Sequence, residues 1–180
     1  MAAINRRLSK TNNTPLMENM NNALHEAFLE ELADAYNAEK QLTKALPKMA
    51  KAAQSNQLRN AIEMHLQETE QHANRLEQAA QTLGTTLKRK KCKGMEGIIE
   101  DGTDMVEEQE NGSTDAVIIA AAQKVEHYEI ATYGTLCSWA KEMGHTQAAE
   151  LLHETLEEEK AADAKLSEIA KTEANAAAQH

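Results

Sequence analysis

The segment FLEELADAYNAEKQLTKALPKM, residues 28–49, contains the pattern that decides the fold. Its apolar side chains recur every three or four positions, at Phe28, Leu32, Ala35, Leu42, Leu46 and Met49. This spacing is typical of the core-facing side of an α-helix. We therefore predict a long helix that begins between Glu18 and Asn22 and ends near Ala53.

Other segments of the chain have the same helical spacing. It predicts long helices over residues 58–83, 115–143 and 146–172, and a short amphipathic helix over residues 95–109. Strand signals are nearly absent, because no run of β-branched or aromatic residues alternates with polar ones. We therefore predict an all-α, up-down four-helix bundle, with the short extra helix in the crossover between helices two and three.

Length and composition fit one helical domain. The 180 residues include only 7 Gly and 2 Pro, and good helix formers such as Ala, Glu, Leu, Lys and Gln dominate. We expect the bundle to occupy residues 21–174. Residues 1–20 are polar and are predicted to form a disordered N-terminal lead.

The charge distribution argues against a nucleic-acid partner. The chain carries a net charge of -10, whereas nucleic-acid binding needs a basic face. One basic run, residues 88–93, departs from this average. Because the run is short and lies between predicted helices, we interpret it as a solvated loop.

Two features indicate a cytoplasmic protein. The first sixteen residues lack the apolar core of a signal peptide, and no apolar run approaches the roughly 20 residues of a membrane span. The two cysteines, Cys92 and Cys137, form no disulfide framework and fit a reducing compartment. We therefore expect no membrane partner.

The two halves of the chain resemble each other at a shift of 90 residues. Apolar residues of the first half fall on apolar residues of the second without a gap, as Phe28 falls on Ile118. Helical hairpins can share such a pattern by chance, so the polar matches are more informative. Glu39 falls on Glu129, and Glu68 falls on Glu158.

These four glutamates are predicted to share one layer of the bundle. Glu39 and Glu129 lie in the middle of apolar stripes, and Glu68 and Glu158 lie beside them. In each predicted hairpin the two glutamates are equally far from the turn, so antiparallel packing places them at the same height. The simpler alternative is that glutamates of an acidic helix lie at its solvent edge.

A buried layer of four carboxylates implies metal. Unpaired buried carboxylates are costly and repel one another, and two divalent cations would neutralise four of them. Carboxylates with an occasional imidazole suit iron or manganese. We therefore predict a site for two such ions, held by Glu39, Glu68, Glu129 and Glu158 with help from His65 and Glu126.

The ligand pattern differs from that of known dimetal bundles. Their usual Glu-x-x-His motif is absent from helices two and four, and helix two offers the reversed order, His65-x-x-Glu68. Helix four offers Glu159 and Asp163 but no nearby inward histidine. We rank His72 and Asp163 lower as ligands.

Residues 24–170 resemble the YciE/YciF family of ferritin-like bacterial stress proteins. The resemblance is carried by residues 36–42 (YNAEKQL), 65–69 (HLQET), 121–131 (AAQKVEHYEIA), 133–136 (YGTL) and 155–160 (TLEEEK). It implies a ferritin-like bundle with a dimetal site, a homodimer, a bacterial cytoplasm and a role in stress. It implies no settled reaction.

Two functions follow as hypotheses. The first is a dimetal oxidoreductase or ferroxidase-like protein that reacts with oxygen or peroxide. The second is a non-catalytic stress protein that binds partners through its bundle and dimer surface. Iron storage in a large cage is a weaker third reading, because nothing in the sequence specifies a shell.

Overall fold

The computed structural model describes residues 15–109 and 113–179, with side chains from Ala23 onward. Its elements are α1 (Pro15–Ala52), α2 (Asn56–Thr82), α3 (Lys93–Glu107), α4 (Thr114–Glu142), α5 (Thr146–Ile169), the π-helical turn η1 (Ala170–Ala174) and α6 (Asn175–Ala177). No strand occurs within the described ranges, so the all-α prediction is confirmed. Of the lead predicted at 1–20, residues 1–14 lie outside the described residues, and α1 begins at Pro15.

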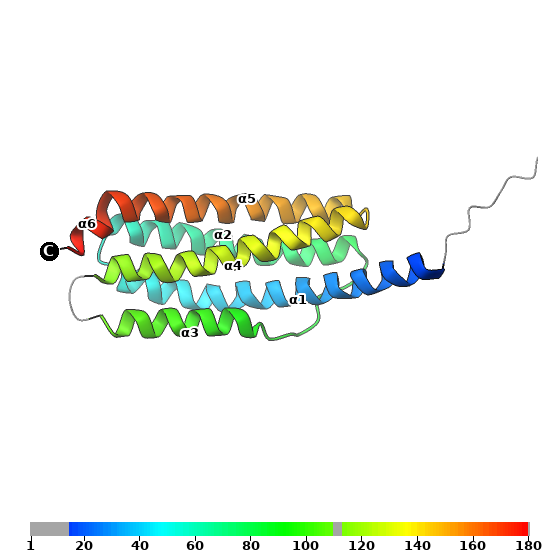
Figure 1. Cartoon of the computed structure of the whole chain (residues 1–180), viewed down its shortest axis with the longest axis horizontal. Coiled ribbons are helices and arrows are strands. Elements are labelled where there is room, and N and C mark those ends of the chain that lie inside the picture. The colour runs from blue at the N-terminus through cyan, green and yellow to red at the C-terminus, as the bar shows by residue number, and fades with distance from the viewer. Residues whose placement is uncertain (1–14, 110–112, 180) are drawn as a thin grey trace, which may run out of the picture.

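The four long helices lie side by side and form a bundle (Figure 1). α1 contacts α2, α2 contacts α5, α5 contacts α4, and α4 contacts α1. Short turns join α1 to α2 and α4 to α5, so each pair is an antiparallel hairpin. α3 belongs to the crossover and packs outside the bundle, against α1 and α4. None of the described helices has the length and apolar character of a membrane span.

The first hairpin turn is fixed by hydrogen bonds to otherwise unpaired backbone groups. The Ser55 hydroxyl accepts from the N–H of Gln57 and Leu58, at 3.1 and 3.3 Å, and so caps α2. The Asp115 carboxylate, in the first turn of α4, accepts from the N–H of Gln54 and Ser55 at 2.7 and 2.8 Å. The start of the second hairpin therefore holds the turn of the first.

The crossover is tied to α1 where α3 begins. Asn37 Oδ1 accepts from the Cys92 N–H at 2.8 Å, and Gln41 Nε2 donates to the Cys92 carbonyl at 2.8 Å. The Cys92 thiol lies 3.1 Å from the Tyr128 hydroxyl of α4. These contacts position α3 across α1 and α4.

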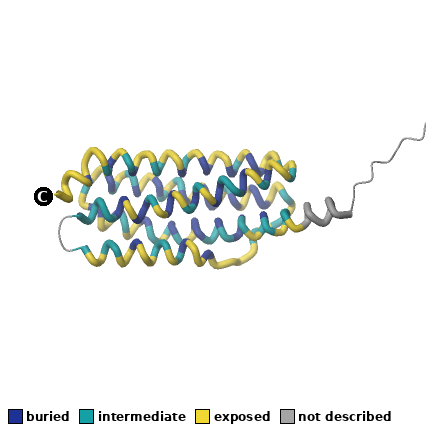
Figure 2. Tube along the Cα trace, viewed as in Figure 1, coloured by how far each residue is buried: buried dark blue, intermediate teal, exposed yellow. Residues whose placement is uncertain are grey.

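Two apolar clusters fill the bundle, one toward each end. One includes Leu42 and Ile118, and the other includes Phe28 and Leu136. Figure 2 shows the buried residues along the inward faces of the long helices. The buried polar residues lie at the boundary between the clusters: Glu39, His65, Thr69, His72, Glu126, Glu129, Thr132, Thr155 and Glu159. A polar layer therefore interrupts the core in the middle of the molecule.

Candidate metal centre

Six ionisable side chains of this layer form what we call the His/Glu cluster. Each of the four long helices contributes to it, and none of the six residues is more than 6% exposed. The members are Glu39 of α1, His65 and His72 of α2, Glu126 and Glu129 of α4, and Glu159 of α5. On α2 and α4 the spacings of seven and three residues place both members on the inward face.

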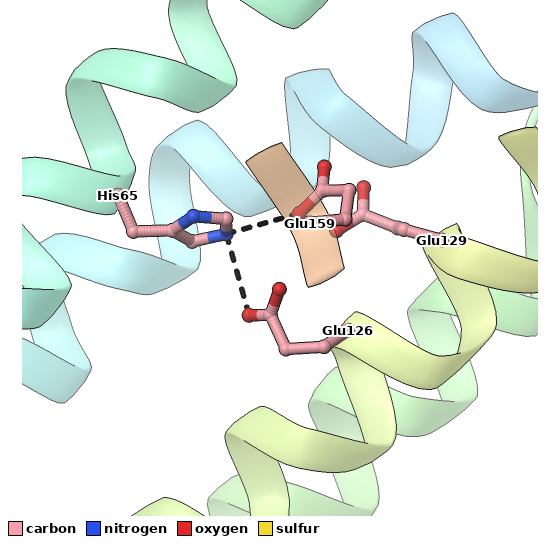
Figure 3. Close-up of side chains that lie close together, drawn as sticks. All are labelled: His65, Glu126, Glu129 and Glu159. Atoms are coloured by element: carbon pink, nitrogen blue, oxygen red, sulfur yellow. Dashed lines mark ion pairs between the residues drawn. The ribbon is translucent and has the colours of Figure 1, made fainter. Parts of the chain in front are cut away.

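The cluster divides into two groups that share one carboxylate. In the first, His65, Glu126, Glu129 and Glu159 each offer a ligand atom, and these atoms lie within 4.8 Å of one another (Figure 3). In the second, Glu39, His72 and Glu159 do the same. Glu159 belongs to both groups, as a carboxylate that bridges two neighbouring cations would.

The distances show how closely the ligand atoms converge. His65 Nε2 lies 3.4 Å from Glu126 Oε1 and 3.8 Å from Glu159 Oε2. His72 Nδ1 lies 2.9 Å from Glu159 Oε1 and 3.7 Å from Glu39 Oε1. The His72–Glu159 pair is close enough for a hydrogen bond, but its angles are not those of one.

Most of the ligand atoms of the cluster make no hydrogen bond. Nine buried side-chain nitrogen and oxygen atoms in the described part of the chain have no such partner, and all nine belong to these six residues. Leaving one buried polar atom unpaired costs about 1–3 kcal/mol, and more when it is charged. Ligation of cations would satisfy most of these atoms, so the donor set fits a metal site.

Burial makes the carboxylates of the cluster hard to ionise without a cation. Burial and the neighbouring Glu159 raise the pKa of Glu39 to about 7. Burial also raises the pKa of Glu126 and of Glu129 well above the ordinary value, with Glu159 adding to both. Three of the four carboxylates therefore hold protons at a higher pH than exposed glutamates do.

Burial and the neighbouring carboxylates shift the pKa of His65 in opposite directions. Burial alone would lower the pKa of His65, but Glu126, Glu68 and Glu159 outweigh it and raise this pKa to about 10. Burial would raise the pKa of Glu159, but His72 and His65 outweigh it and lower this pKa. In the absence of metal, protons on histidine and glutamate balance the charge of the cluster.

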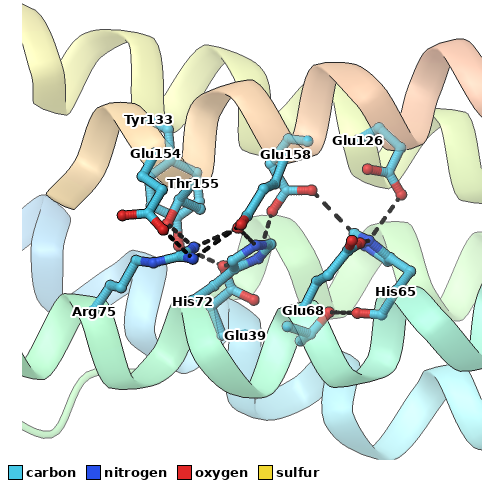
Figure 4. A network of polar contacts seen from close by, with 12 residues as sticks. Glu39, His65, Glu68, His72, Arg75, Glu126, Tyr133, Glu154, Thr155 and Glu158 are labelled. Carbon is cyan, nitrogen blue, oxygen red and sulfur yellow. Dashed lines mark hydrogen bonds and ion pairs between the residues drawn. The ribbon is translucent and has the colours of Figure 1, made fainter. Parts of the chain in front are cut away.

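A second set of side chains orients the His72 side of the cluster (Figure 4). The Tyr133 hydroxyl donates to Glu39 Oε1. His72 Nε2 lies 2.9 Å from Glu158 Oε2, and Arg75 binds both oxygens of Glu158 and also Glu154. Carboxylates that hydrogen-bond the far nitrogen of a metal-binding histidine fix its ring and tautomer.

Four of the six residues predicted from the sequence lie in the cluster: Glu39, His65, Glu126 and Glu129. The other two, Glu68 and Glu158, lie at its solvent edge, with 43% and 31% of their side chains exposed. Glu68 Oε2 is 3.4 Å from His65 Nδ1. Asp163 lies outside the cluster and accepts from Gln123 Nε2 at 2.9 Å.

The structure brings two other residues into the cluster. Glu159, the neighbour of Glu158, is fully buried, and so is His72. Their signal in the sequence is the helical spacing of three and four residues, which places His72 on one face with His65 and Thr69. The same spacing places Glu159 on one face with Thr155 and Ala162.

Comparison with known proteins identifies the family. The profile of a domain of unknown function, DUF892, matches residues 23–179. The chain belongs to the DUF892 family. This member is 46% identical to Protein YciF of Escherichia coli strain K12 over 159 residues, which cover 87% of this chain and 96% of the relative. The family resemblance predicted from the sequence is confirmed.

Solved structures agree with this assignment. The crystal structure of the E. coli stress protein YciF matches this DUF892 chain with a TM-score of 0.81 and 47% identity, over 84% of this chain and 97% of the other. YcfI of Rhodopseudomonas palustris matches with a TM-score of 0.78 and 41% identity, over 80% and 92% of the two chains. A protein of Xanthomonas campestris, 21% identical with a TM-score of 0.68 over 86% and 94% of the two chains, shares the fold.

Proposed function

We propose that this DUF892 protein is a ferritin-like stress protein that holds two divalent ions, iron or manganese, in the His/Glu cluster and reacts with oxygen or peroxide. The observation that carries the proposal is the set of nine unpartnered buried atoms on six histidine and glutamate side chains. Their division into two groups with Glu159 in common suits two neighbouring ions.

Charge and donor type support iron or manganese. The four carboxylates of the cluster would balance the four positive charges of two divalent ions. Mixed carboxylate and imidazole donors suit these metals, whereas calcium takes more oxygen ligands and few nitrogens. Bound iron or manganese would supply the one-electron steps that reactions with oxygen or peroxide require.

The ligand set is a variant of the one found in ferritin-like bundles. Those bundles draw a glutamate from two helices and a Glu-x-x-His pair from each of the other two. Here α1 and α5 each supply one glutamate, α2 supplies two histidines and α4 supplies two glutamates. Both sets contain four glutamates and two histidines, but the distribution of these residues over the helices differs.

The family supports the biological setting that we propose. YciF of E. coli is described as a stress protein. From the family resemblance we also propose a homodimer in a bacterial cytoplasm.

The alternative is a non-catalytic stress protein that binds partners through its bundle and dimer surface. The raised pKa values of Glu39 and His65 favour it, because protons alone can balance the charge of the cluster. The polar layer would then be a structural element, and the protein would contain no bound iron or manganese.

Elemental analysis of protein purified without chelator separates the two functions. We expect about two iron or manganese atoms per chain in the wild type, as in dimetal bundles, and almost none in the Glu39→Ala/Glu129→Ala double variant. A Glu70→Ala/Glu150→Ala variant, which removes two exposed glutamates of α2 and α5, is the matched control and should keep its metal.

The result that would contradict the dimetal function is equally direct. Wild-type protein that contains no metal, and takes up none from anaerobic ferrous iron, would exclude the proposed centre and support the alternative. Circular dichroism of both double variants checks that the helices are intact.

A further inference from the structure

The 90-residue repeat places equivalent residues at the two hairpin turns of the bundle. Ser55 precedes α2 in the first turn, and its counterpart before α5 in the second turn is His145. Asp115, which holds the first turn, has His25 of α1 as its counterpart. Each turn therefore meets one residue from the first helix of the other hairpin.

The contact at the second turn differs chemically from the contact at the first. Ser55 caps α2 with its hydroxyl, and Asp115 accepts two backbone N–H groups of the turn. His145 makes no side-chain capping bond to α5, and its Nε2 instead lies 3.3 Å from His25 Nδ1. Two imidazole rings therefore stand where the first turn has a cap and a carboxylate.

The turn and a neighbouring ring together fix the position of His145. Gly144 has a φ of +74°, which glycine adopts without strain, and its N–H donates to the Lys141 carbonyl at 3.1 Å. The His145 N–H donates to the Ala140 carbonyl at 2.8 Å, which completes a Schellman motif at the end of α4. Phe28 of α1 stacks on the His145 ring, with centroids 6.1 Å apart and planes inclined by 27°. The imidazole is therefore held in place before any ion binds.

The separation of the two ring nitrogens suits two ligands of one metal ion. Zinc binds imidazole nitrogen at about 2.0–2.1 Å with tetrahedral geometry, which puts two ligand nitrogens about 3.3–3.4 Å apart. His25 Nδ1 and His145 Nε2 have this separation, 3.3 Å. Both residues are half-buried, so an ion can reach them from solvent. Burial and the neighbouring His25 lower the pKa of His145, which favours the neutral imidazole that metals bind.

We propose that His25 and His145 bind one divalent ion of the zinc type, with water molecules as its remaining ligands. The ion replaces the proton that the two rings share as a hydrogen bond in the metal-free protein. Two imidazole donors without a carboxylate suit zinc, copper or nickel better than manganese.

This histidine pair is separate from the His/Glu cluster. His25 and Glu39 are 14 positions apart on α1, which corresponds to about 21 Å along the helix. The bound ion joins α1 to the turn between α4 and α5, past which α1 runs at one end of the bundle (Figure 1). The inference therefore goes beyond the proposed function and does not depend on it.

Zinc binding is measured by calorimetry on the full-length Glu39→Ala/Glu129→Ala protein, in which the His/Glu cluster lacks two ligands. We expect one saturable step that both His25→Ala and His145→Gln remove or weaken by more than about 10–100-fold, the cost of losing a partner that merely orients a ligand. Glutamine can still hydrogen-bond to His25, so His145→Gln separates metal binding from the hydrogen bond. His153→Ala, which removes a histidine of α5 with 55% of its side chain exposed, is the matched control and should keep the step.

NMR of the imidazole nitrogens identifies the ligand atoms. Zinc should shift the resonances of His25 Nδ1 and His145 Nε2 and leave those of His153 unchanged, because only the first two nitrogens lie within the span of one ion. Circular dichroism checks that all variants fold.

Three outcomes would overturn the inference. The first is a protein without a saturable zinc step, or with a step that the variants at residues 25, 145 and 153 keep equally; the two rings would then only share a hydrogen bond. The second is a zinc-dependent dimer in sedimentation that His145→Gln abolishes, because the ion would then join two copies of the chain. The third is loss of iron or manganese from the His/Glu cluster when His145→Gln is made in the wild type, because the pair would then act on the cluster through the fold.

Failure of this site and failure of the proposed function can be told apart. A wild-type protein with two iron or manganese ions and no zinc step would keep the proposed function and lose the histidine site. A zinc step in a protein that takes up no iron or manganese would do the reverse.

Discussion

Glu157, Glu158 and Glu159 are consecutive on α5 and have three different environments. Glu157 is exposed and pairs with Lys160 at 2.8 Å. Glu158 lies at the edge, between His72 and Arg75. Glu159 is fully buried and is common to both ligand groups. A helix turns by about 100° per residue, so adjacent side chains face solvent, interface and core.

This series gives a prediction at the scale of single residues. Glu159→Gln should abolish binding of both metal ions, because it removes the carboxylate that both groups share. Glu158→Gln should keep both ions and weaken their binding by about 10–100-fold, the usual effect of changing a partner that orients a ligand. Glu157→Gln should change neither. Titration with ferrous iron or manganese, followed by calorimetry, measures all three.

The result that would reverse the assignment is loss of metal in Glu158→Gln with retention in Glu159→Gln. That outcome would restore the ligand set expected from the sequence, in which Glu158 and Glu68 bind metal. If all three variants bind both metal ions as tightly as the wild type does, then α5 supplies no ligand.

The sequence contained enough information to find most of the cluster. Glu39 and Glu129 interrupt apolar stripes, and this pattern alone indicates buried carboxylates. On α5, the repeat matches Glu158 to Glu68, whereas the stripe of buried residues Leu152, Thr155 and Glu159 points to the next residue. Periodicity reports which side of a helix is buried, and the repeat only reports which residues correspond.

At the scale of elements, α3 is the least constrained by its sequence. Its apolar residues predicted an amphipathic helix over 95–109, and the structure has α3 at Lys93–Glu107. The pattern could not show which helices it covers, because an apolar stripe specifies burial and not the partner. The backbone of α3 approaches α4 at two glycines: a Cβ on Gly94 would lie 2.9 Å from Tyr128, and one on Gly102 would lie 3.0 Å from Ala121 Cβ.

Two glycines of α3 give a prediction for this contact. Gly97→Ala should raise the free energy of unfolding by about 1 kcal/mol, because Gly97 has open space around it and alanine favours the helix. Gly102→Ala has the same helical gain, but its new methyl group would press on Ala121 Cβ, which is fixed to the backbone of α4. We therefore expect it to be less stable than Gly97→Ala by about 1–3 kcal/mol, as in overpacked cores.

Urea unfolding of both variants, followed by circular dichroism, measures this difference. If Gly102→Ala gains as much stability as Gly97→Ala, then α3 does not pack tightly on α4. Such a result would show that the crossover helix is only loosely attached to the bundle.

At the scale of the whole molecule, the polar layer divides the core and ties stability to pH. Between pH 4.5 and about 7, folded Glu39 keeps a proton that the unfolded chain has released. Between pH 6.5 and about 10, folded His65 does the same. A folded state that holds more protons than the unfolded state loses stability as pH rises. The lowered pKa of Glu159 makes stability rise with pH, but only below pH 4.5, which lies outside the ranges in which Glu39 and His65 act.

The metal-free protein should therefore be more stable at pH 5 than at pH 8. Each unit of pKa shift corresponds to about 1.4 kcal/mol. Glu39 and His65 together should therefore lower the free energy of unfolding by about 4–5 kcal/mol over this range. Metal binding should restore stability mainly at pH 8, because ligands must lose their protons before they bind a cation. Urea unfolding in chelator and in excess manganese, at both pH values, measures these changes.

The Glu39→Gln/Glu129→Gln variant should lose most of the pH dependence attributed to these carboxylates and most of the gain from manganese. If the wild-type protein in chelator is equally stable at both pH values, then the residues of the His/Glu cluster have the same pKa values in the folded and unfolded states.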